Sequence, residues 1–375
     1  MSKIKILYIV NVDYFILSHR LPILMEALKH GFEVHIACAD TGKFKELEAF
    51  GFHMHGLSLQ RKNMNILSFI KDFYEVNAII KLVQPSVMHL LTIKPIILGG
   101  LHSFLFQQRK IVASMTGLGF VFSSNRFLIK CLRVIIKIIY RFILGRDNVN
   151  IIVQNEEDRT KILRIASANP SNVHLIKGTG IDMKNVQFKE LKDQDQKIIF
   201  MASRLLKDKG VNEFLMASNL LSDRAKEITF WLAGQIDDEN PESFTSKELK
   251  KLQEQYSNVI FLGQISNVLE VLEDSYIAVL PSYREGFPKF LSESASIGRP
   301  IITTDVAGCR DAVINNQTGL LVPPRNHIKL ANAIEFLVDN FITAKNFSLK
   351  GRQFAEEELN LESVLSKHIE IYNSF

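Results

Sequence analysis

The sequence predicts an α/β protein of two tandem domains, each with a parallel β-sheet covered by helices. Short apolar runs alternate with amphipathic stretches along the chain, as in βα units. A polar, charged stretch without apolar periodicity, VQFKELKDQDQK, interrupts this alternation and places a domain boundary near residues 178–196. A length of 375 residues also suits two domains.

The first domain is expected to span residues 1–178. Its apolar runs predict strands at residues 4–10, 33–38, 87–91, 110–115 and 150–155. Helices are expected in stretches that include residues 18–29, 66–84 and 125–145. The N-terminal run has no small-residue cleavage site, so it is interpreted as a strand and not as a signal peptide.

The second domain is expected to span residues 179–358, and a C-terminal helix at 359–375 is expected to pack back on the first domain. Strands are predicted at 197–203, 228–234, 258–263, 277–282, 300–305 and 319–323. Helices are predicted near 210–222, 245–256, 289–298 and 326–340. Both domains are expected to be Rossmann-like, with sheets facing a central cleft, since ligands bind at the carboxyl ends of parallel strands. Neither half has G-x-G-x-x-G after its first strand, which disfavours a dinucleotide-binding enzyme.

Composition narrows the possible classes of protein. The chain is 47% hydrophobic and 23% charged, which excludes a disordered protein. Its three widely spaced cysteines argue against a disulfide framework and a cysteine zinc site, and suit a reducing compartment. Residues 1–150 carry 19 Lys+Arg against 9 Asp+Glu (+10), whereas residues 151–375 carry 26 against 31 (−5). A basic first half suits nucleic acid, an anionic membrane or a phosphorylated ligand, and the absence of RNA-binding motifs and zinc fingers disfavours nucleic acid.

The strongest local pattern is PSYREGFPKFLSESASIGRP at residues 281–300, which predicts a strand, a turn and a helix. Gly286 lets the backbone approach a ligand closely, and Pro288 suits a helix start. The free N–H groups of such a helix can hold a phosphate. Glu285 and Glu293 flank the turn with seven residues between them. The alternative is an ordinary strand–turn–helix unit with a solvated acidic pair.

A second pattern follows the strand KIIFMAS, where Arg204 and Lys209 precede Gly210. Two cations at a strand's carboxyl end can hold a diphosphate, Arg204 as a fork and Lys209 as a point charge. A solvated loop before a helix is the alternative. The two patterns lie on different strands of one predicted sheet, so their joint presence favours a functional site.

Together, SRLLKDKG and EGFPKFLSE resemble the retaining glycosyltransferases of family 4, which have the GT-B fold. The resemblance extends over the second domain, including PIITTDVAGCRDAV and NNQTGLLVP. It implies that Arg204 and Lys209 hold the donor diphosphate and that Glu285 meets the donor sugar, as the catalytic set. It also implies four donor-binding residues. The backbone of Gly286, Phe287 and Pro288 lines the phosphates, and Glu293 accepts hydrogen bonds from the ribose hydroxyls.

Three first-domain segments resemble transferases that extend lipid-linked O-antigen and bacterial N-glycan intermediates: RLPILMEALKHGFEVH, HLLTIKPIILGGL and ASMTGLGFVF. This N-acetylgalactosaminyltransferase-like resemblance implies a UDP-sugar donor, an N-acetylhexosamine or a hexose, and an undecaprenyl-pyrophosphate-linked acceptor. The expected pathway is lipopolysaccharide, polysaccharide or glycan biosynthesis. The alternatives are a sugar-nucleotide epimerase or hydrolase of the same fold, and a non-catalytic membrane-docking protein.

The first domain departs from the family pattern at one loop, because Thr116 and Gly117 stand where many members have a histidine. His19, His89 and His102 could substitute for that histidine, and His19, at the first βα junction, is the better candidate of the three. The expected acceptor-side residues are His19, Lys94, Thr116 and Gly117. His89 lies in a strand pattern and is expected in the core.

Asp237 and Asp238 are adjacent acidic residues that resemble a metal pair. They are interpreted as a loop, because the two cations and a helix end already supply positive charge. The reaction is therefore expected to need no metal and no other cofactor.

A basic stripe marks the expected helix at residues 126–144. Its five charged residues all fall within about 80° of arc on an otherwise apolar helix: Arg126, Lys130, Arg133, Lys137 and Arg141. An interfacial helix on the anionic cytoplasmic face of the inner membrane fits this pattern and predicts a cytoplasmic, peripheral protein. The alternative is a helix packed on its sheet with a basic outer edge.

Overall fold

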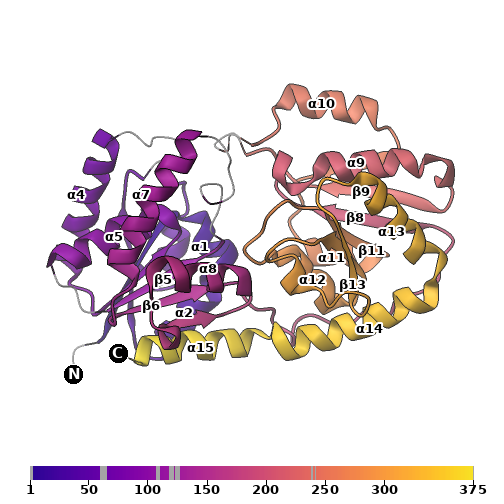
Figure 1. Ribbon diagram of the computed structural model, residues 1–375. Coiled ribbons are helices and arrows are strands. Elements are labelled where there is room, and N and C mark those ends of the chain that lie inside the picture. Colours follow the sequence, from indigo (N-terminus) through magenta and orange to yellow (C-terminus); the bar gives the residue numbers. More distant parts are fainter. Residues whose placement is uncertain are drawn as a thin grey trace. The chain divides into compact units, whose positions relative to one another are not determined.

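The computed structural model describes residues 3–59, 66–106, 110–117, 122, 127–237, 240 and 242–374. It divides into two compact units (Figure 1). One unit comprises Met1–Thr179 together with Glu362–Phe375, and the other comprises Gly180–Leu361. The last helix of the chain is thus part of the first unit.

The first unit is built on a seven-stranded sheet in the order β3-β2-β1-β4-β5-β6-β7, in which every pairing is parallel. Its strands are β1 (Lys5–Val12), β2 (Glu33–Ala39), β3 (His53–Gly56), β4 (Val87–Leu91), β5 (Ile111–Met115), β6 (Val149–Val153) and β7 (Val173–Leu175). Its helices are α1 (Tyr14–His19), α2 (Leu21–Lys29), α3 (Phe44–Ala49), α4 (Ile66–Val83), α5 (Ile93–Phe106), α7 (Phe127–Leu144), α8 (Glu156–Ala166) and α15 (Leu361–Asn373).

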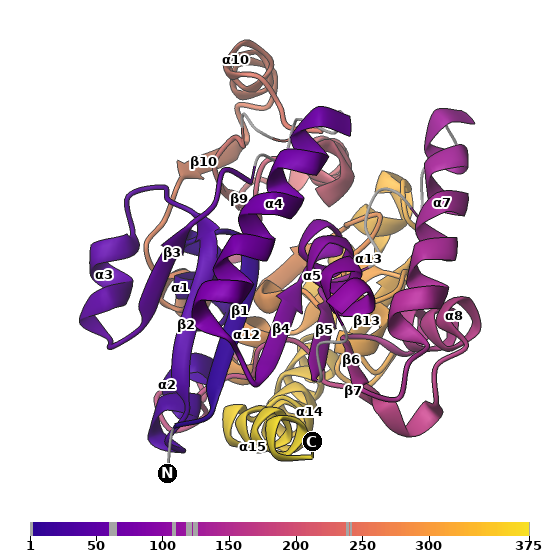
Figure 2. The ribbon, with the colours of Figure 1, turned by 90° about the vertical axis from the view of Figure 1, so that its left-hand side faces the viewer.

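Two apolar cores cover the two faces of this sheet. Side chains of α4, α5 and α7 form one core with alternate residues of the strands, and those of α1, α2 and α15 form the other. Figure 2 shows the helices α4, α5 and α7 and the strands that they cover. The alternation follows from the period of two in a strand: Leu7 and Ile9 face the first core, and Ile6 and Tyr8 face the second. Strands buried on both faces explain the nearly continuous apolar runs of the sequence.

The second unit has a six-stranded parallel sheet in the order β10-β9-β8-β11-β12-β13. Its strands are β8 (Lys197–Ala202), β9 (Ile228–Ala233), β10 (Val259–Gly263), β11 (Ile277–Leu280), β12 (Ile301–Thr304) and β13 (Gly319–Val322). Its helices are α9 (Val211–Leu220), α10 (Ser246–Gln255), α11 (Val268–Asp274), α12 (Lys289–Ile297), α13 (His327–Asp339) and α14 (Phe341–Glu358). The strand order reverses between the neighbours β8 and β11, which is where ligands of such sheets bind.

Every strand expected from an apolar run is present, and the fold class is confirmed as α/β with two parallel sheets. The helix expected at 18–29 is different: two helices, α1 and α2, replace it. Arg20 leaves the helical conformation, with φ −129° and ψ −11°, and proline follows in the first turn of α2. The edge strands β3 and β7 were not predicted, because HMHG and VHL are short and carry polar residues.

Candidate active site

The site is centred on an ion pair between two strand ends of the second unit. Lys209 closes the 3-10 turn after β8, and Glu285 follows β11. Nζ of Lys209 lies 2.5 Å from Oε1 of Glu285. The two side chains are only 17% and 11% exposed, so each charge depends on the other for neutralisation. The structure thus brings together two of the three residues expected to be catalytic.

Two glycines allow the loops of this site to approach one another. Gly210 has φ +76°, and a Cβ there would lie 2.1 Å from the carbonyl oxygen of Pro281. Gly308 has φ +78°, and a Cβ there would lie 2.4 Å from the carbonyl oxygen of Gly286. A larger residue at Gly210 would force the Lys209 loop away from the loop of Glu285, and one at Gly308 would displace the backbone of Glu285 and Gly286.

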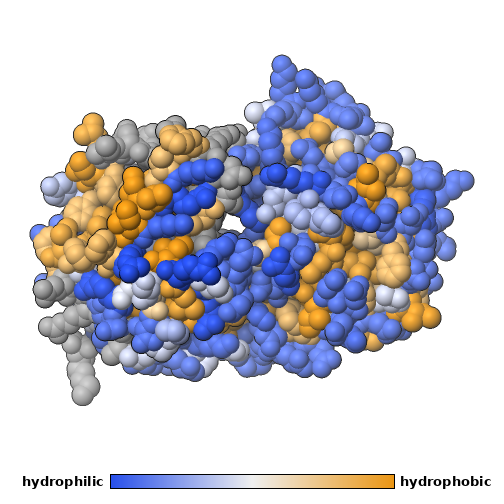
Figure 3. Space-filling model, in the orientation of Figure 1, coloured by the Kyte–Doolittle hydropathy of each residue, from blue (hydrophilic) through white to orange (hydrophobic). Residues whose placement is uncertain are grey.

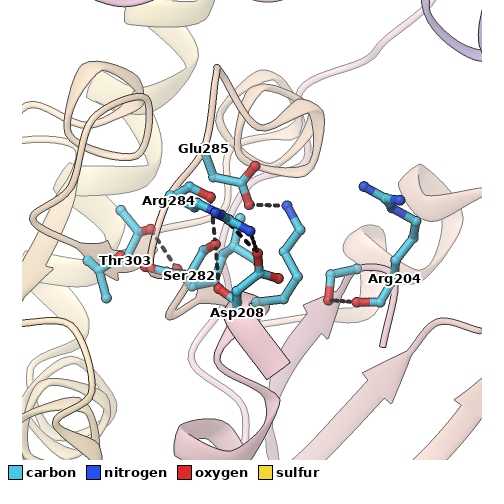
Figure 4. Close-up of polar contacts among 10 residues, drawn as sticks. Arg204, Asp208, Ser282, Arg284, Glu285 and Thr303 are labelled. Carbon is cyan, nitrogen blue, oxygen red and sulfur yellow. Dashed lines mark hydrogen bonds and ion pairs between the residues drawn. The ribbon is translucent and has the colours of Figure 1, made fainter. Parts of the chain in front are cut away.

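A second ion pair braces the same two loops. Arg284 donates from Nε and from one terminal nitrogen to Oδ2 of Asp208, at 3.0 and 2.6 Å. Oγ of Ser282 donates to the backbone carbonyl of Asp208 at 3.1 Å. Figure 4 shows Arg284 and Asp208 turned toward each other beside Glu285. This brace was not predicted, because two residues 76 apart in sequence give no local pattern.

Tyr283 links the loop after β11 to the helix α9. Its hydroxyl donates to Oε1 of Glu213 in α9 at 2.6 Å, and the guanidinium of Arg325 lies 4.7 Å from its ring centroid. Burial and the carboxylate of Glu213 raise the pKa of Tyr283, so its hydroxyl keeps its proton and remains a donor.

Arg204 lies apart from the Lys209–Glu285 pair (Figure 4). It also follows β8, but a terminal guanidinium nitrogen contacts Oδ2 of Asp237 at 2.6 Å, and its side chain is 47% exposed. The two expected diphosphate cations therefore do not converge on one point, and each has a carboxylate partner. Asp237, interpreted from sequence as a loop residue, is that partner of Arg204; Asp238 lies outside the described residues.

The helix α12 begins directly after the turn, as predicted. Its N-cap is Pro288, and no side chain caps its first N–H groups. Glu293 lies one turn into the helix, is 13% exposed and has Nζ of Lys289 at 3.4 Å. Burial raises the pKa of Glu293. A buried carboxylate that contacts one lysine retains acceptor capacity for a ligand's hydroxyl groups.

The first-domain candidates lie at the carboxyl ends of neighbouring strands. His19 ends α1 after β1 and stacks on Phe15 at 4.7 Å between ring centroids. Lys94 follows β4, and its Nζ contacts the buried carboxylate of Asp72 at 2.6 Å. Thr116 and Gly117 follow β5, and Gly117 has φ +103°.

Two further expectations concern buried and basic residues of the first unit. His89 is fully buried, which confirms the prediction that it is a core residue.

On α7, Lys130, Lys137 and Arg141 are exposed and Arg133 is half-buried, whereas Arg126 lies outside the described residues.

Known protein families match both units of the chain. The model "Glycosyl transferases group 1" matches residues 182–354, and "Glycosyl transferase 4-like" matches residues 5–155. The capsular polysaccharide biosynthesis glycosyltransferase CapM of Staphylococcus aureus is 21% identical over 100% of this chain and 98% of its own. An N,N'-diacetylbacillosaminyl-diphospho-undecaprenol alpha-1,3-N-acetylgalactosaminyltransferase of Campylobacter jejuni is 24% identical over 90% and 91%.

Solved structures share the whole fold. The sucrose-phosphate synthase of Thermosynechococcus elongatus superposes with a TM-score of 0.79 at 19% identity, over 99% of both chains. HepE of Anabaena, solved with UDP and glucose, superposes with a TM-score of 0.78 at 16% identity, over 99% of this chain and 100% of its own. With both units matched by glycosyltransferase models and the fold shared from end to end, the chain is a glycosyltransferase of the group 1 and family 4-like type, with the GT-B fold.

Proposed function

We propose that the enzyme transfers a hexose or N-acetylhexosamine from a UDP-sugar to an undecaprenyl-pyrophosphate-linked saccharide, with retention of the anomeric configuration. The observation that carries the proposal is the close approach of Lys209 and Glu285 beside the uncapped start of α12. These groups lie where the strand order of the sheet reverses. The cation and the first N–H groups of α12 match the diphosphate of a nucleotide sugar, and the carboxylate matches its hydroxyl groups.

The donor diphosphate binds to positive groups of the second unit. The first N–H groups of α12 donate to phosphate oxygens, as the helix dipole favours. Lys209 adds a point charge and Arg204 a planar fork, each exchanging its present carboxylate partner for phosphate. Glu285, released from its ion pair, accepts hydrogen bonds from the sugar hydroxyls, and Glu293 accepts from the ribose diol.

Transfer then breaks the bond between the anomeric carbon and the β-phosphate oxygen. Charge develops on the leaving UDP, and Lys209, Arg204 and the α12 terminus stabilise it without a metal or other cofactor. The acceptor hydroxyl attacks from the same face and gives its proton to the departing phosphate oxygen, which retains the configuration. The acceptor-side candidates are His19, Lys94, Thr116 and Gly117.

The acceptor class is supported by two independent features. The Campylobacter jejuni relative is named for an undecaprenol-linked diphosphate acceptor. The first unit also exposes apolar side chains on α4, α5 and α7, three helices that pack side by side. The most exposed are Leu67, Tyr74 and Leu82 on α4, Leu105 and Phe106 on α5, and Phe127, Val134, Ile135 and Phe142 on α7, at 54–80%.

This apolar surface lies beside the basic residues of α7 (Figure 3). The helix has no acidic residue, and its described cations are Lys130, Arg133, Lys137 and Arg141. Among the described residues, no helix combines the length and hydropathy needed to cross a bilayer. An apolar surface flanked by cations suits peripheral binding to an anionic lipid surface, as on the cytoplasmic face of an inner membrane.

The proposal is tested by incubating the full chain with a panel of UDP-sugars and a short undecaprenyl-pyrophosphate-linked saccharide. We expect acceptor-dependent release of UDP and a product whose new linkage has the donor's anomeric configuration by NMR. UDP-sugar turnover at the same rate without acceptor would instead indicate a hydrolase or epimerase. Failure to bind any nucleotide would indicate a non-catalytic membrane-docking protein.

A further inference from the structure

Four potential metal ligands lie on one face of the outer strands of the first unit. Glu33 and His35 alternate along β2, and His53 and His55 alternate along β3. The strands pair in parallel with His35 opposite His53. Because side chains two residues apart share a face, this register gathers one carboxylate and three imidazoles.

The side chains are in contact with one another. Nε2 of His35 lies 2.8 Å from Oε1 of Glu33, and the His35 and His53 rings stack with centroids 4.7 Å apart. One ligand atom each of Glu33, His35 and His53 lies within 4.8 Å of the others. On the other side of the ring, Nδ1 of His35 lies 3.0 Å from Nε2 of His55.

The chemistry of these side chains favours metal binding. Imidazole nitrogens and carboxylate oxygens are ligands of divalent transition metals. Lys5 is a weak competitor, with Nζ 3.8 Å from Glu33.

We propose that Glu33, His35 and His53 bind one divalent transition-metal ion, and that His55 orients the His35 ring from behind. Two imidazoles and a carboxylate suit Zn²⁺ and its neighbours, whereas Mg²⁺ and Ca²⁺ prefer oxygen ligands. A hydrogen bond to the second ring nitrogen of a ligating histidine fixes its orientation. His53 is exposed, so its ring can turn toward the ion.

The consequence of such a site is structural. β3 is a four-residue edge strand that pairs only with β2 among the described strands, and the ion links the two. Glu33 is the first residue of β2, so the cluster lies toward the amino ends of the strands. The candidate acceptor-side residues lie at the carboxyl ends. The ion is therefore expected to hold the edge strand in place without taking part in sugar transfer.

The test is calorimetric titration of Zn²⁺ into the untagged, metal-free full chain. We expect saturable binding of one ion, weakened at least tenfold in His53→Gln and unchanged in the control His30→Gln. His30 is a matched control because it is exposed and contacts a single carboxylate, Glu26, at 3.5 Å. Lys5→Gln should bind at least as tightly as wild type, because it removes the competing cation.

Hydrogen exchange supplies a second readout that does not depend on activity. Zn²⁺ should slow amide exchange in β3 of the wild type and leave it unchanged in His53→Gln. Since His53 is exposed, this variant should match the metal-free melting temperature of wild type. Absence of saturable binding, or equal affinity in wild type and His53→Gln, would overturn the proposal and indicate adventitious surface binding.

Discussion

Nζ of Lys209 and Oε1 of Glu285 lie 2.5 Å apart, although 76 positions separate the two residues in sequence. Each side chain is at most 17% exposed, so loss of one partner leaves an uncompensated charge in a poorly solvated position. Substitutions here are consequently expected to change stability as well as the proposed catalysis, so a folding check accompanies each test of function.

Glu285→Ala should lower kcat by about 10²–10³, the scale for losing one preorganised polar contact. The reason is that the hydroxyls of the transferred sugar lose their carboxylate acceptor. Steady-state kinetics with UDP-sugar and acceptor would measure this, with circular dichroism to verify folding. Glu254→Ala, an exposed glutamate on α10, is the matched control and should behave as wild type. Wild-type turnover in Glu285→Ala would remove this residue from the mechanism.

Arg204→Ala and Lys209→Ala should each weaken UDP binding by about tenfold to a hundredfold, because a charge-assisted hydrogen bond contributes about 1.5–3 kcal/mol. Affinity for uridine, which has no phosphate, should change little. Calorimetric titration with both ligands separates the two effects. Lys207→Ala is the matched control, since Lys207 lies in the same turn but pairs with Glu248 at 3.0 Å. Equal losses for UDP and uridine would show that Arg204 and Lys209 do not face phosphate.

Glu293→Gln should stabilise the enzyme at pH 7 while weakening uridine binding. Burial raises the pKa of Glu293 above its ordinary value of 4.5. Because the folded pKa exceeds the unfolded one, ionisation lowers the free energy of unfolding above the folded pKa, and this cost disappears as pH falls below 4.5. Thermal melts across a pH series should show the variant's advantage shrinking toward pH 4. A wild type that is more stable at pH 7 would contradict this account.

Changing Lys130, Arg133 and Lys137 to Gln should weaken binding to anionic vesicles. The attraction is screened within about 10 Å at 0.1 M salt, so binding of the wild type should also fall as salt rises. Sedimentation with vesicles measures both effects. The control, Lys29, Lys43 and Lys45 to Gln, removes the same charge from α2 and the region of α3.

The variant with Lys130, Arg133 and Lys137 changed to Gln should keep its affinity for UDP-sugar and its activity on a short water-soluble acceptor. It should lose activity on the long lipid-linked acceptor. A companion variant, Ile135 and Ile138 to Ser, should lose vesicle binding at every salt concentration, because it removes exposed apolar area. If the basic variant sediments like wild type at all salt concentrations, the basic residues are only a solvated helix edge.

Treatment with EDTA should leave kcat unchanged, because Lys209, Arg204 and the α12 terminus supply the positive charge that a metal provides in other transferases. Removal of an ion from the Glu33–His35–His53 cluster should lower only the melting temperature. Initial rates after dialysis against EDTA, with and without added Mn²⁺ or Mg²⁺, measure the first effect. Abolished activity that Mn²⁺ restores would return Asp237 and Asp238 to consideration as metal ligands.

The sequence alone was sufficient for the order of the elements. A strand buried on both faces must be apolar throughout, so runs such as KIIFMAS are visible without any tertiary information. The start of α12 after Pro288 and its end at Gly298, with φ +85°, follow from local backbone preferences. The edge strand β3 was not predicted, because it is half-exposed and its two histidines leave no apolar run.

The sequence by itself determined the fold class and the enzyme class and supplied the residues proposed for the donor site, because each is encoded in contiguous patterns. Only the tertiary structure decided which side chains pair. Lys209 meets Glu285, Arg204 meets Asp237 and Arg284 meets Asp208. The first and third pairs join the loops after β8 and β11, which the reversal of strand order makes neighbours, and the second joins the loops after the adjacent strands β8 and β9. Electrostatic pairing acts over a few ångströms of space and leaves no trace in sequence spacing.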